Sequence, residues 1–265
     1  MKSWNITGKI LPALVTLVYS FLWVPVIILI VFSFSNDKYG IGWKGFTLGW
    51  YSEILNNVAV RNALETSLII AIITVVVSTV AGTLTAYGLY KYKFRGKEIL
   101  RMSLLLPIVM PYIVTAGALL VFFTRVAHIP LGYPSILIAH ISFSTPLAVF
   151  VILGRMQRID WTLEEASIDL GADRLTTWRK ITIPLLLPAI IASAVLIFPW
   201  SLGDFTVTFF VAGAGTTTLP IYVFSALRWG ETATINAIGA IFVALPVICL
   251  LLVTLLQRKG VRKSW

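Results

Sequence analysis

Charged residues are scarce in this sequence. Of its 265 residues, 12% are charged and 58% are hydrophobic, and the mean hydropathy is +0.91. Soluble globular domains carry about 25% charged residues, and a soluble protein of this length needs a polar surface that this composition cannot supply. Most of the surface must therefore face lipid. The composition excludes an ordinary soluble domain and predicts an integral membrane protein.

Cysteine, histidine and phosphate-binding motifs are also nearly absent. A single cysteine, Cys249, excludes an intrachain disulfide. His128 and His140 have no cysteine or carboxylate at ligand spacing, which favours a structural role over metal binding. No G-x-x-x-x-G-K-[ST] segment occurs, so the chain lacks the loop that holds ATP phosphates.

A membrane protein of this composition could also be a membrane enzyme or an ion-coupled secondary transporter. A membrane enzyme would need a cluster of catalytic or metal-binding residues near one membrane face, and the sparse histidines disfavour it. An ion-coupled secondary transporter would predict inverted repeats and several acidic residues within the spans. The sequence has neither feature, so both classes remain secondary alternatives.

Six segments are long and apolar enough to cross a bilayer, which needs about 20 mostly apolar residues in a helix. The first is too long for the apolar core of a signal peptide and is followed by no small-residue cleavage site, so we expect it to be retained. The sequence therefore predicts an all-α, polytopic protein with one transmembrane domain over residues 1–265. The expected spans are Leu11–Phe34, Leu64–Tyr90, Met102–Thr124, Pro134–Gly154, Leu185–Val211 and Ile235–Gln257.

The basic residues are distributed unequally between the two sides of these spans. Sixteen of the 21 lysines and arginines lie in the two termini and in the loops after the second and fourth spans, and five lie in the other loops. Because cytoplasmic loops carry the excess of Lys and Arg, both termini are predicted to be cytoplasmic. The net charge of +10 follows from this topology and requires no nucleic-acid partner.

The predicted cytoplasmic loop Arg155–Pro184 has the pattern of two short helices. Thr162 and Glu165 have capping-box spacing at the start of the first helix. Gly171 fits the left-handed position that ends a helix. Asp173 is expected to cap a second helix over Arg174–Ile181, which Pro184 is expected to end. A short apolar stripe at helical spacing lies on the first helix: Leu163, Ala166 and Leu170.

This loop resembles the EAA motif of binding-protein-dependent ABC importer permeases. Glu165-Ala166-Ser167, then Gly171 after three residues and Ile181-Thr182-Ile183-Pro184 after nine more, follow the family pattern, with Ser167 and Ile183 as the two departures. The resemblance implies a type I permease fold and a coupling helix that docks on an ATPase. Capping alone for Glu165 and an ordinary helix stop at Gly171 are the structural alternatives. The implied coupling residues are Glu164, Glu165, Ala166, Ser167, Asp169, Gly171, Ala172, Ile181 and Pro184.

The same resemblance implies the partners and the mechanism. We expect a second permease, either identical to this chain or a related chain of the PotB type. We also expect two ATPase subunits that bind ATP and Mg²⁺, and an extracytoplasmic solute-binding protein. The chain itself is expected to hold no cofactor and to catalyse no reaction. Its expected place is the bacterial inner membrane, where it works by alternating access.

Three shorter segments resemble the permeases of spermidine/putrescine importers, of the PotC type: Gly49–Tyr51, Tyr90–Lys97 and Leu170–Ala172. The resemblance implies a polyamine substrate, and another small organic solute or ion is the alternative. Ammonium groups bind carboxylates and aromatic faces. Relatives of this type tend to carry an acidic pair in span five and an acid after a proline in span three. This chain has Gly203 and Tyr112 at those two places.

Asp204 is the clearest ionisable residue within a span, and such residues are functional by default. Pro199 and Gly203 are expected to break the helix beside it, which membranes tolerate where a cavity covers the backbone. A structural role at the helix break, or pairing with an arginine of the second permease, is the alternative for Asp204. Trp50 has an interfacial anchor as its alternative role, and Trp200 has packing. The expected substrate path comprises Asp204, Ser201, Trp50, Tyr112 and Trp200.

Overall fold

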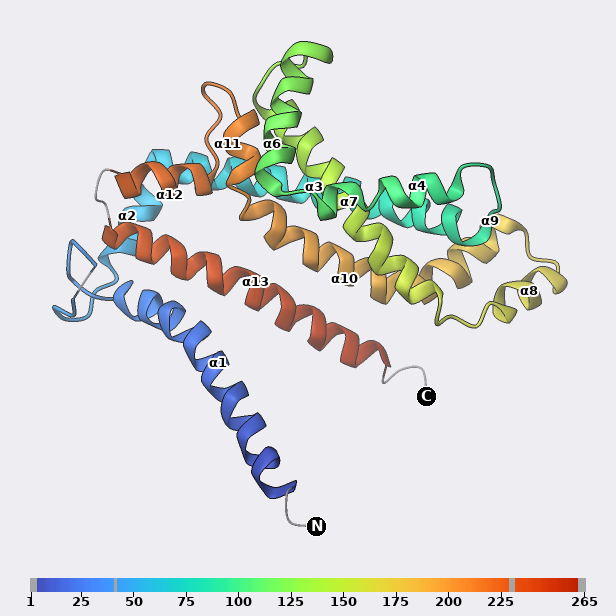
Figure 1. The fold of residues 1–265 in the computed structure, drawn as a ribbon, viewed down its shortest axis with the longest axis horizontal. Helices are drawn as coiled ribbons and strands as arrows, with labels where there is room; N and C mark the ends of the chain where they lie inside the picture. Colours follow the sequence, from blue (N-terminus) through green and yellow to red (C-terminus); the bar gives the residue numbers. More distant parts are fainter. Residues whose placement is uncertain (1–3, 41, 229–231, 262–265) are drawn as a thin grey trace. The chain divides into compact units, whose positions relative to one another are not determined.

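The computed structural model describes residues 4–40, 42–228 and 232–261. Its regular elements are helices, with one isolated β-bridge between Ser35 and Phe46. In chain order they are α1 Trp4–Phe32, α2 Gly49–Asn56, α3 Val58–Lys91, α4 Lys97–Ser103, α5 Leu106–Val109, α6 Tyr112–Val121, the π-helix η1 Phe122–Val126, α7 Tyr133–Met156, α8 Thr162–Asp169, α9 Arg174–Thr177, the π-helix η2 Trp178–Thr182, α10 Ile183–Leu202, α11 Thr206–Val211, α12 Leu219–Arg228 and α13 Thr232–Val261 (Figure 1).

The predicted all-helical membrane fold is confirmed. Among the described residues, five helices are long and apolar enough to cross a membrane, and a bent pair of helices supplies a sixth span if it is counted as one. Helices α3, α7 and α13 contain the second, fourth and sixth predicted spans, and α1 begins several residues before Leu11. The short helices α2 and α12 were not predicted.

The third predicted span, Met102–Thr124, is divided between two helical parts. Its two parts, Lys97–Val109 and Tyr112–Val126, meet at an angle of 108°. Pro111 explains the break, because its ring disfavours helical backbone at the preceding residue. Met110 accordingly has an extended conformation, with φ −67° and ψ 141°.

The fifth predicted span, Leu185–Val211, is interrupted where the sequence indicated. Helix α10 ends at Leu202 and α11 begins at Thr206. The Gly203 amide donates its hydrogen bond to the Pro199 carbonyl, which completes the last turn of α10. Three residues of irregular backbone then separate the two helices, and the expected break beside Asp204 is confirmed.

Pro184 does not end a helix, contrary to the sequence prediction. The helical chain runs from α9 through η2 directly into α10, and Pro184 lies in the first turn of α10. A proline within a helix leaves a carbonyl without its donor. The wider π-helical turn at Trp178–Thr182 lies where this donor is missing and lets the helix continue.

The described chain divides into two compact units, Met1–Arg61 with Tyr222–Leu245, and Asn62–Ile221 with Pro246–Trp265. In the first unit, the loop after α1 is held by polar contacts. The Trp50 indole donates a 2.8 Å hydrogen bond to the Ser35 carbonyl, and Lys44 pairs with Asp37 at 2.9 Å. Phe34 stacks on Tyr51 with a centroid separation of 5.3 Å.

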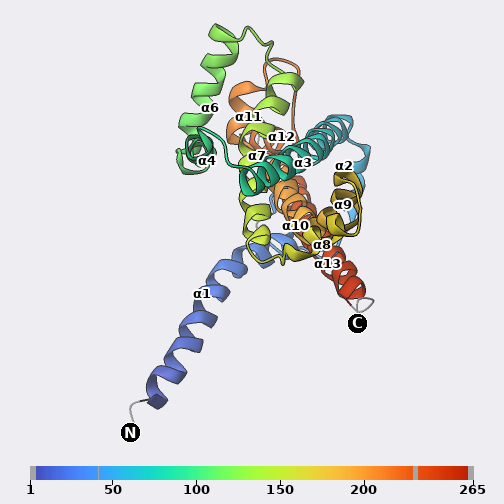
Figure 2. The same cartoon turned by 90° about the vertical axis from the view of Figure 1, so that its right-hand side faces the viewer.

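In the second unit, α7 is the central helix. One buried apolar cluster joins it to α6 and α11, and another joins it to α3 and α10. Figures 1 and 2 show α11 beside α6, and α10 beside α7. Helix α3 approaches α7 closely at Gly82, where a Cβ atom would lie 2.4 Å from the Cβ of Ala148. Close contacts through small residues are a common way for membrane helices to pack.

Candidate functional site

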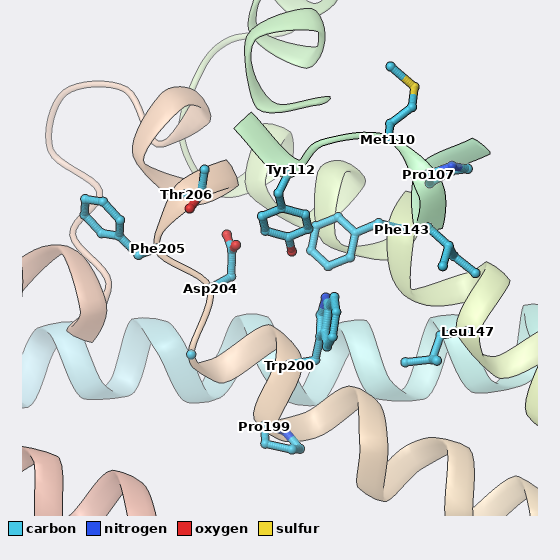
Figure 3. Close-up of a pocket in the computed structure, with 12 residues that line it drawn as sticks. Pro107, Met110, Tyr112, Phe143, Leu147, Pro199, Trp200, Asp204, Phe205 and Thr206 are labelled. Atoms are coloured by element: carbon cyan, nitrogen blue, oxygen red, sulfur yellow. The ribbon is translucent and has the colours of Figure 1, made fainter. Parts of the chain in front are cut away.

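A cavity of about 640 Å³ lies in the second unit, beside the break between α10 and α11. Its lining comes from α5, α6, α7, α10 and the irregular backbone after α10, so it forms where two interrupted spans meet. Figure 3 shows Tyr112, Phe143 and Trp200 gathered on one side, with Asp204 facing them. The lining residues are Pro107, Ile108, Met110, Tyr112, Phe143, Leu147, Pro199, Trp200, Gly203, Asp204, Phe205 and Thr206.

Three aromatic rings form one wall of this cavity. Tyr112 meets Phe143 edge-on with centroids 5.6 Å apart, and meets Trp200 edge-on at 6.1 Å. Trp200 is 52% exposed, so much of its indole surface remains free to contact a ligand. Aromatic faces of this kind attract ammonium groups through the ring quadrupole.

Asp204 is held by donors from the start of α11. One oxygen, Oδ2, accepts the Thr208 amide at 2.8 Å and the Thr208 hydroxyl at 2.7 Å, and Oδ1 accepts the Val207 amide at 3.4 Å. These are the amides that a helix start leaves without partners, so the carboxylate caps α11. The Asp204 side chain is only 1% exposed, and it lines the cavity facing the aromatic rings (Figure 3).

His140 joins the two sides of this helix break. From α7, its Nε2 atom lies 3.2 Å from Asp204 Oδ2 and 2.9 Å from the Thr208 hydroxyl, while Nδ1 lies 2.7 Å from the Ser201 hydroxyl at the end of α10. The sequence reasoning did not connect His140 with Asp204. One feature of the sequence could have indicated this role. His140 lies within an apolar span, and a polar side chain at that depth needs a partner.

The remaining predicted path residues are placed differently. Ser201 is buried and bonds His140, and Tyr112 and Trp200 line the cavity. Trp50 belongs to the other unit, where it lies on α2 and bonds Ser35. Among the described residues, no group of three His, Cys, Asp or Glu side chains could hold a metal ion.

The second candidate site is the α8–α9 segment. Gly171 has φ +85°, as the sequence predicted, and follows the end of α8. Its amide bonds the Ile168 carbonyl, and the Ala172 amide bonds the Ser167 carbonyl. This pair of bonds is the Schellman ending, which requires a left-handed residue at the position of Gly171.

The predicted capping box at Thr162 and Glu165 is wrong. Thr162 is the first helical residue of α8, and no side-chain cap bond is made at the preceding position. Asp160 performs the capping instead, accepting the Thr162 hydroxyl at 2.8 Å and its amide at 3.1 Å. These hydrogen bonds hold the pKa of the Asp160 carboxyl below its usual range.

Asp173 occupies the position immediately before α9, as predicted, but its side chain makes no capping hydrogen bond there. A hydrogen bond with the Thr176 side chain lowers the pKa of its carboxyl. The predicted second helix, Arg174–Ile181, is present as α9 and most of η2. The turn between α8 and α9 is also tied by the Ser167 and Thr177 hydroxyl groups, 3.0 Å apart.

The predicted coupling residues differ in exposure. Glu165, Ala166, Asp169, Gly171 and Pro184 are exposed. Two apolar side chains of the predicted stripe are also exposed, Leu163 at 49% and Leu170 at 90%. Ser167, Ala172 and Ile181 are half-buried, and Glu164 is buried. The segment thus offers a mixed polar and apolar surface of the kind that a protein partner covers.

Comparison with known proteins places this architecture among transporters. The fold matches a bacterial ABC transporter that imports the acidic polysaccharide alginate, with a TM-score of 0.71 at 17% identity, covering 100% of this chain and 97% of that one. An amino acid ABC transporter matches with a TM-score of 0.60 at 16% identity, covering 81% and 100%. These likenesses show that the chain shares its fold with chains of known ABC transporter structures.

Sequence comparison gives the family. The family described as "Binding-protein-dependent transport system inner membrane component" matches residues 78–263. The spermidine/putrescine permease PotC of Haemophilus influenzae is 39% identical over 94% of this chain and 96% of its own length. PotC of Escherichia coli K12 is 38% identical, covering 92% of each chain, and the putrescine permease PotI of the same strain is 36% identical over 84% and 82%.

The chain belongs to this family of binding-protein-dependent ABC importer permeases. It is a multi-pass membrane protein and a non-catalytic transport component, homologous to the PotC and PotI polyamine permeases. Permeases of this family work with ATPase subunits and a solute-binding protein, and this chain is expected to hold no cofactor of its own.

Proposed function

We propose that this permease imports polyamines such as spermidine or putrescine through the cavity beside Asp204. The observation that carries the proposal is the cavity wall itself, in which the rings of Tyr112, Phe143 and Trp200 face one carboxylate. The ammonium groups of a flexible polycation can form cation–π contacts with these rings. The negative charge of the Asp204 carboxylate, which faces the rings, attracts the same groups. The resemblance to PotC and PotI over most of the chain supports the same substrate class.

The aromatic wall also accounts for the smaller number of acidic residues at this site. Tyr112 and Gly203 occupy the two positions where permeases of the PotC type tend to carry acidic residues. Asp204 supplies the carboxylate that lines the cavity. Recognition then relies on ring faces for the methylene chain and ammonium groups. Asp204 contributes a longer-range attraction while His140 holds it in place.

The deciding experiment is uptake of labelled spermidine and putrescine by the complete importer in ATP-loaded vesicles, with unlabelled amino acids and sugars as competitors. We expect polyamine uptake that requires ATP, persists without ion gradients and is inhibited only by other polyamines. Absence of polyamine uptake by a complex that hydrolyses ATP would reject this substrate class and favour another small solute. Uptake driven by a proton or sodium gradient alone would contradict ATP-driven import.

We further propose that the exposed part of α8, with Glu165, Ala166 and Asp169, docks on the ATPase. Its exposed apolar side chains and the rigid turn at Gly171 support this role. Replacement of Gly171 by arginine should prevent docking, measured as loss of ATPase copurification. Normal assembly and transport by Gly171→Arg would reject it.

The proposed complex has two further features, the orientation of this chain and the identity of its partner permease. Residues 1–265 act as one transmembrane permease domain with both termini in the cytoplasm, which the distribution of basic residues supports. The second permease is a related chain of the PotB type, and the two together enclose the path by alternating access. Copurification with a tagged candidate permease tests the pairing, and self-association into a homodimer would contradict it.

A further inference from the structure

Glu164 joins three elements of the cytoplasmic segment through one carboxylate. One oxygen lies 2.6 Å from the Nζ atom of Lys91, the last residue of α3. The other accepts the hydroxyl hydrogen of Thr182, the last residue of η2 before α10 begins. Helix α8 is therefore bound at one point to the end of a membrane-spanning helix and to the entrance of another.

Trp161 supplies a second connection between α8 and α3. Lys91 Nζ lies 3.8 Å from the centre of its indole ring, and the ring itself packs against Tyr90 with centroids 5.2 Å apart. The indole nitrogen lies 3.0 Å from the Tyr90 hydroxyl oxygen and 3.1 Å from the Met156 carbonyl oxygen, so it can donate to both. We call Lys91, Trp161, Glu164 and Thr182 the Glu164 cluster.

The burial of this cluster sets it apart from a surface ion pair. The Glu164 side chain is 10% exposed and that of Lys91 is 25% exposed, whereas the adjacent Glu165 is exposed. A pair shielded in this way is screened less by salt than one at the surface. Removing Lys91 leaves the largely buried Glu164 carboxylate without its cationic partner, so the pair resists separation.

We propose that Glu164 is a positioning residue that transmits movement of α8 to α3 and α10, and that it does so without touching the ATPase. When the exposed face of α8 is pushed, the Glu164 cluster makes α8, the end of α3 and the start of α10 move together. This role replaces the sequence-based expectation that Glu164 docks on the ATPase directly. It rests on the proposed docking of α8.

The test measures ATP hydrolysis and labelled spermidine uptake in parallel, with the complete importer in vesicles. In Glu164→Gln we expect the ATPase to copurify and basal hydrolysis to continue, while uptake per ATP falls about two- to thirtyfold, the range produced by single residues along a coupling route. Stimulation of hydrolysis by the solute-binding protein should fall in parallel, which gives a readout independent of the solute. Lys93→Gln is the matched control, because it removes an exposed charge near the same helix end.

A double-mutant cycle separates a joint action from two independent effects. Lys91→Gln should resemble Glu164→Gln, and the double variant should be no worse than either single one. If the loss in the double variant equals the product of the two single losses, the proposal is rejected. An unchanged ratio of uptake to ATP in Glu164→Gln would also reject it. Loss of ATPase copurification in Glu164→Gln would show direct docking by Glu164 and would also reject it.

Two conservative variants keep the test decisive if Glu164→Gln does not accumulate as a folded permease. Glu164→Asp and Lys91→Arg keep both charges and change only the geometry of the pair, so each should lower the same ratio with the ATPase retained. An unchanged ratio in both would reject the proposal. Glu165→Arg, measured alongside, tests docking separately. Normal ATPase binding by that variant would reject the docking proposal, on which the role of Glu164 rests, whatever ratio of uptake to ATP Glu164→Gln shows.

Discussion

His140 and Asp204 form a buried pair, with Nε2 and Oδ2 3.2 Å apart and both side chains 1% exposed. The histidine comes from α7, and the carboxylate lies in the gap between α10 and α11. Because Nδ1 of the same ring bonds Ser201 on α10, the imidazole spans the whole gap. The break in the fifth span is therefore a fixed structure with its polar groups satisfied, rather than a loosened stretch of helix.

Replacement of His140 by phenylalanine should destabilise the protein. The substitution keeps a ring of similar shape, but it removes the buried partner of the Ser201 hydroxyl and one of the partners of Asp204. The loss of a buried hydrogen-bond partner costs about 1–3 kcal/mol. Thermal unfolding of the purified importer measures the effect. His128→Asn is the control, because His128 is exposed and asparagine tolerates its φ of +50°. Equal melting temperatures for the two variants would contradict the bridging role.

Asp204→Asn should weaken polyamine uptake while leaving assembly intact. The Thr208 donors can still bond the amide oxygen, but the cavity loses its carboxylate charge. At about 10 Å and an effective dielectric constant of about 20, one charge pair is worth about 1–2 kcal/mol, so KM should rise about five- to thirtyfold. Spermidine uptake over a concentration series measures this change. Unchanged KM would return Asp204 to a purely structural role as the cap of α11.

Gly82→Ala should disturb the packing of α3 on α7. The new methyl group would lie 2.4 Å from the Ala148 Cβ, and overpacking of this kind costs about 1–3 kcal/mol. Gly88→Ala on the same helix is the matched control, because its Cβ would meet no atom within 4 Å. Thermal unfolding should separate the two variants, and equal stability would show that the α3–α7 contact relaxes freely.

Gly171→Ala tests the helix ending that orients α8. A Cβ atom there would meet nothing within 4 Å, so the cost is the backbone strain of φ +85° alone, about 1–2 kcal/mol. We expect reduced uptake per ATP, with a milder effect for Gly171→Asn because asparagine tolerates the left-handed region. Gly154→Ala, also without a neighbour, should transport normally. A normal ratio of uptake to ATP hydrolysis in Gly171→Ala would show that coupling does not depend on this turn.

The orientation of the α8–α9 segment can be tested by chemical labelling. A cysteine at exposed Asp169, introduced after Cys249→Ser, should be protected from an impermeant thiol reagent in intact cells and labelled after the cells are opened. A cysteine at exposed Tyr39, in the loop after α1, should already be labelled in intact cells. Labelling of the Asp169 position in intact cells would reverse the predicted topology.

Hydrophobic length predicted the spans well, because a helix in lipid must satisfy its own backbone and needs a fixed number of apolar residues. The wrong predictions concern helix ends, where two local interactions compete and the sequence does not show which one forms. Thr162 had the spacing of a helix cap, but its hydroxyl bonds Asp160 instead. Pro184 reads as a helix stop, yet the π-helical turn before it lets the helix continue.

The candidate site was predictable in part for the same reason. Asp204 was conspicuous because an acidic residue in an apolar span needs an explanation. Its partner His140 lies far away in the sequence, and only the packing of α7 against α10 and α11 brings them together. Glu164 and Lys91 likewise meet through tertiary packing, and no local pattern distinguishes buried Glu164 from exposed Glu165.

The uninterrupted helix from α9 through η2 into α10 restricts how related sequences can vary. Each residue added to a helix turns everything beyond it by about 100° and shifts it by about 1.5 Å. One insertion between Asp173 and Pro184 would therefore rotate α8 away from Lys91, whatever residue was inserted. Substitutions at exposed positions of this stretch leave the register unchanged, whereas changes of length do not, so the interval between Gly171 and Pro184 should stay constant wherever the segment keeps its role.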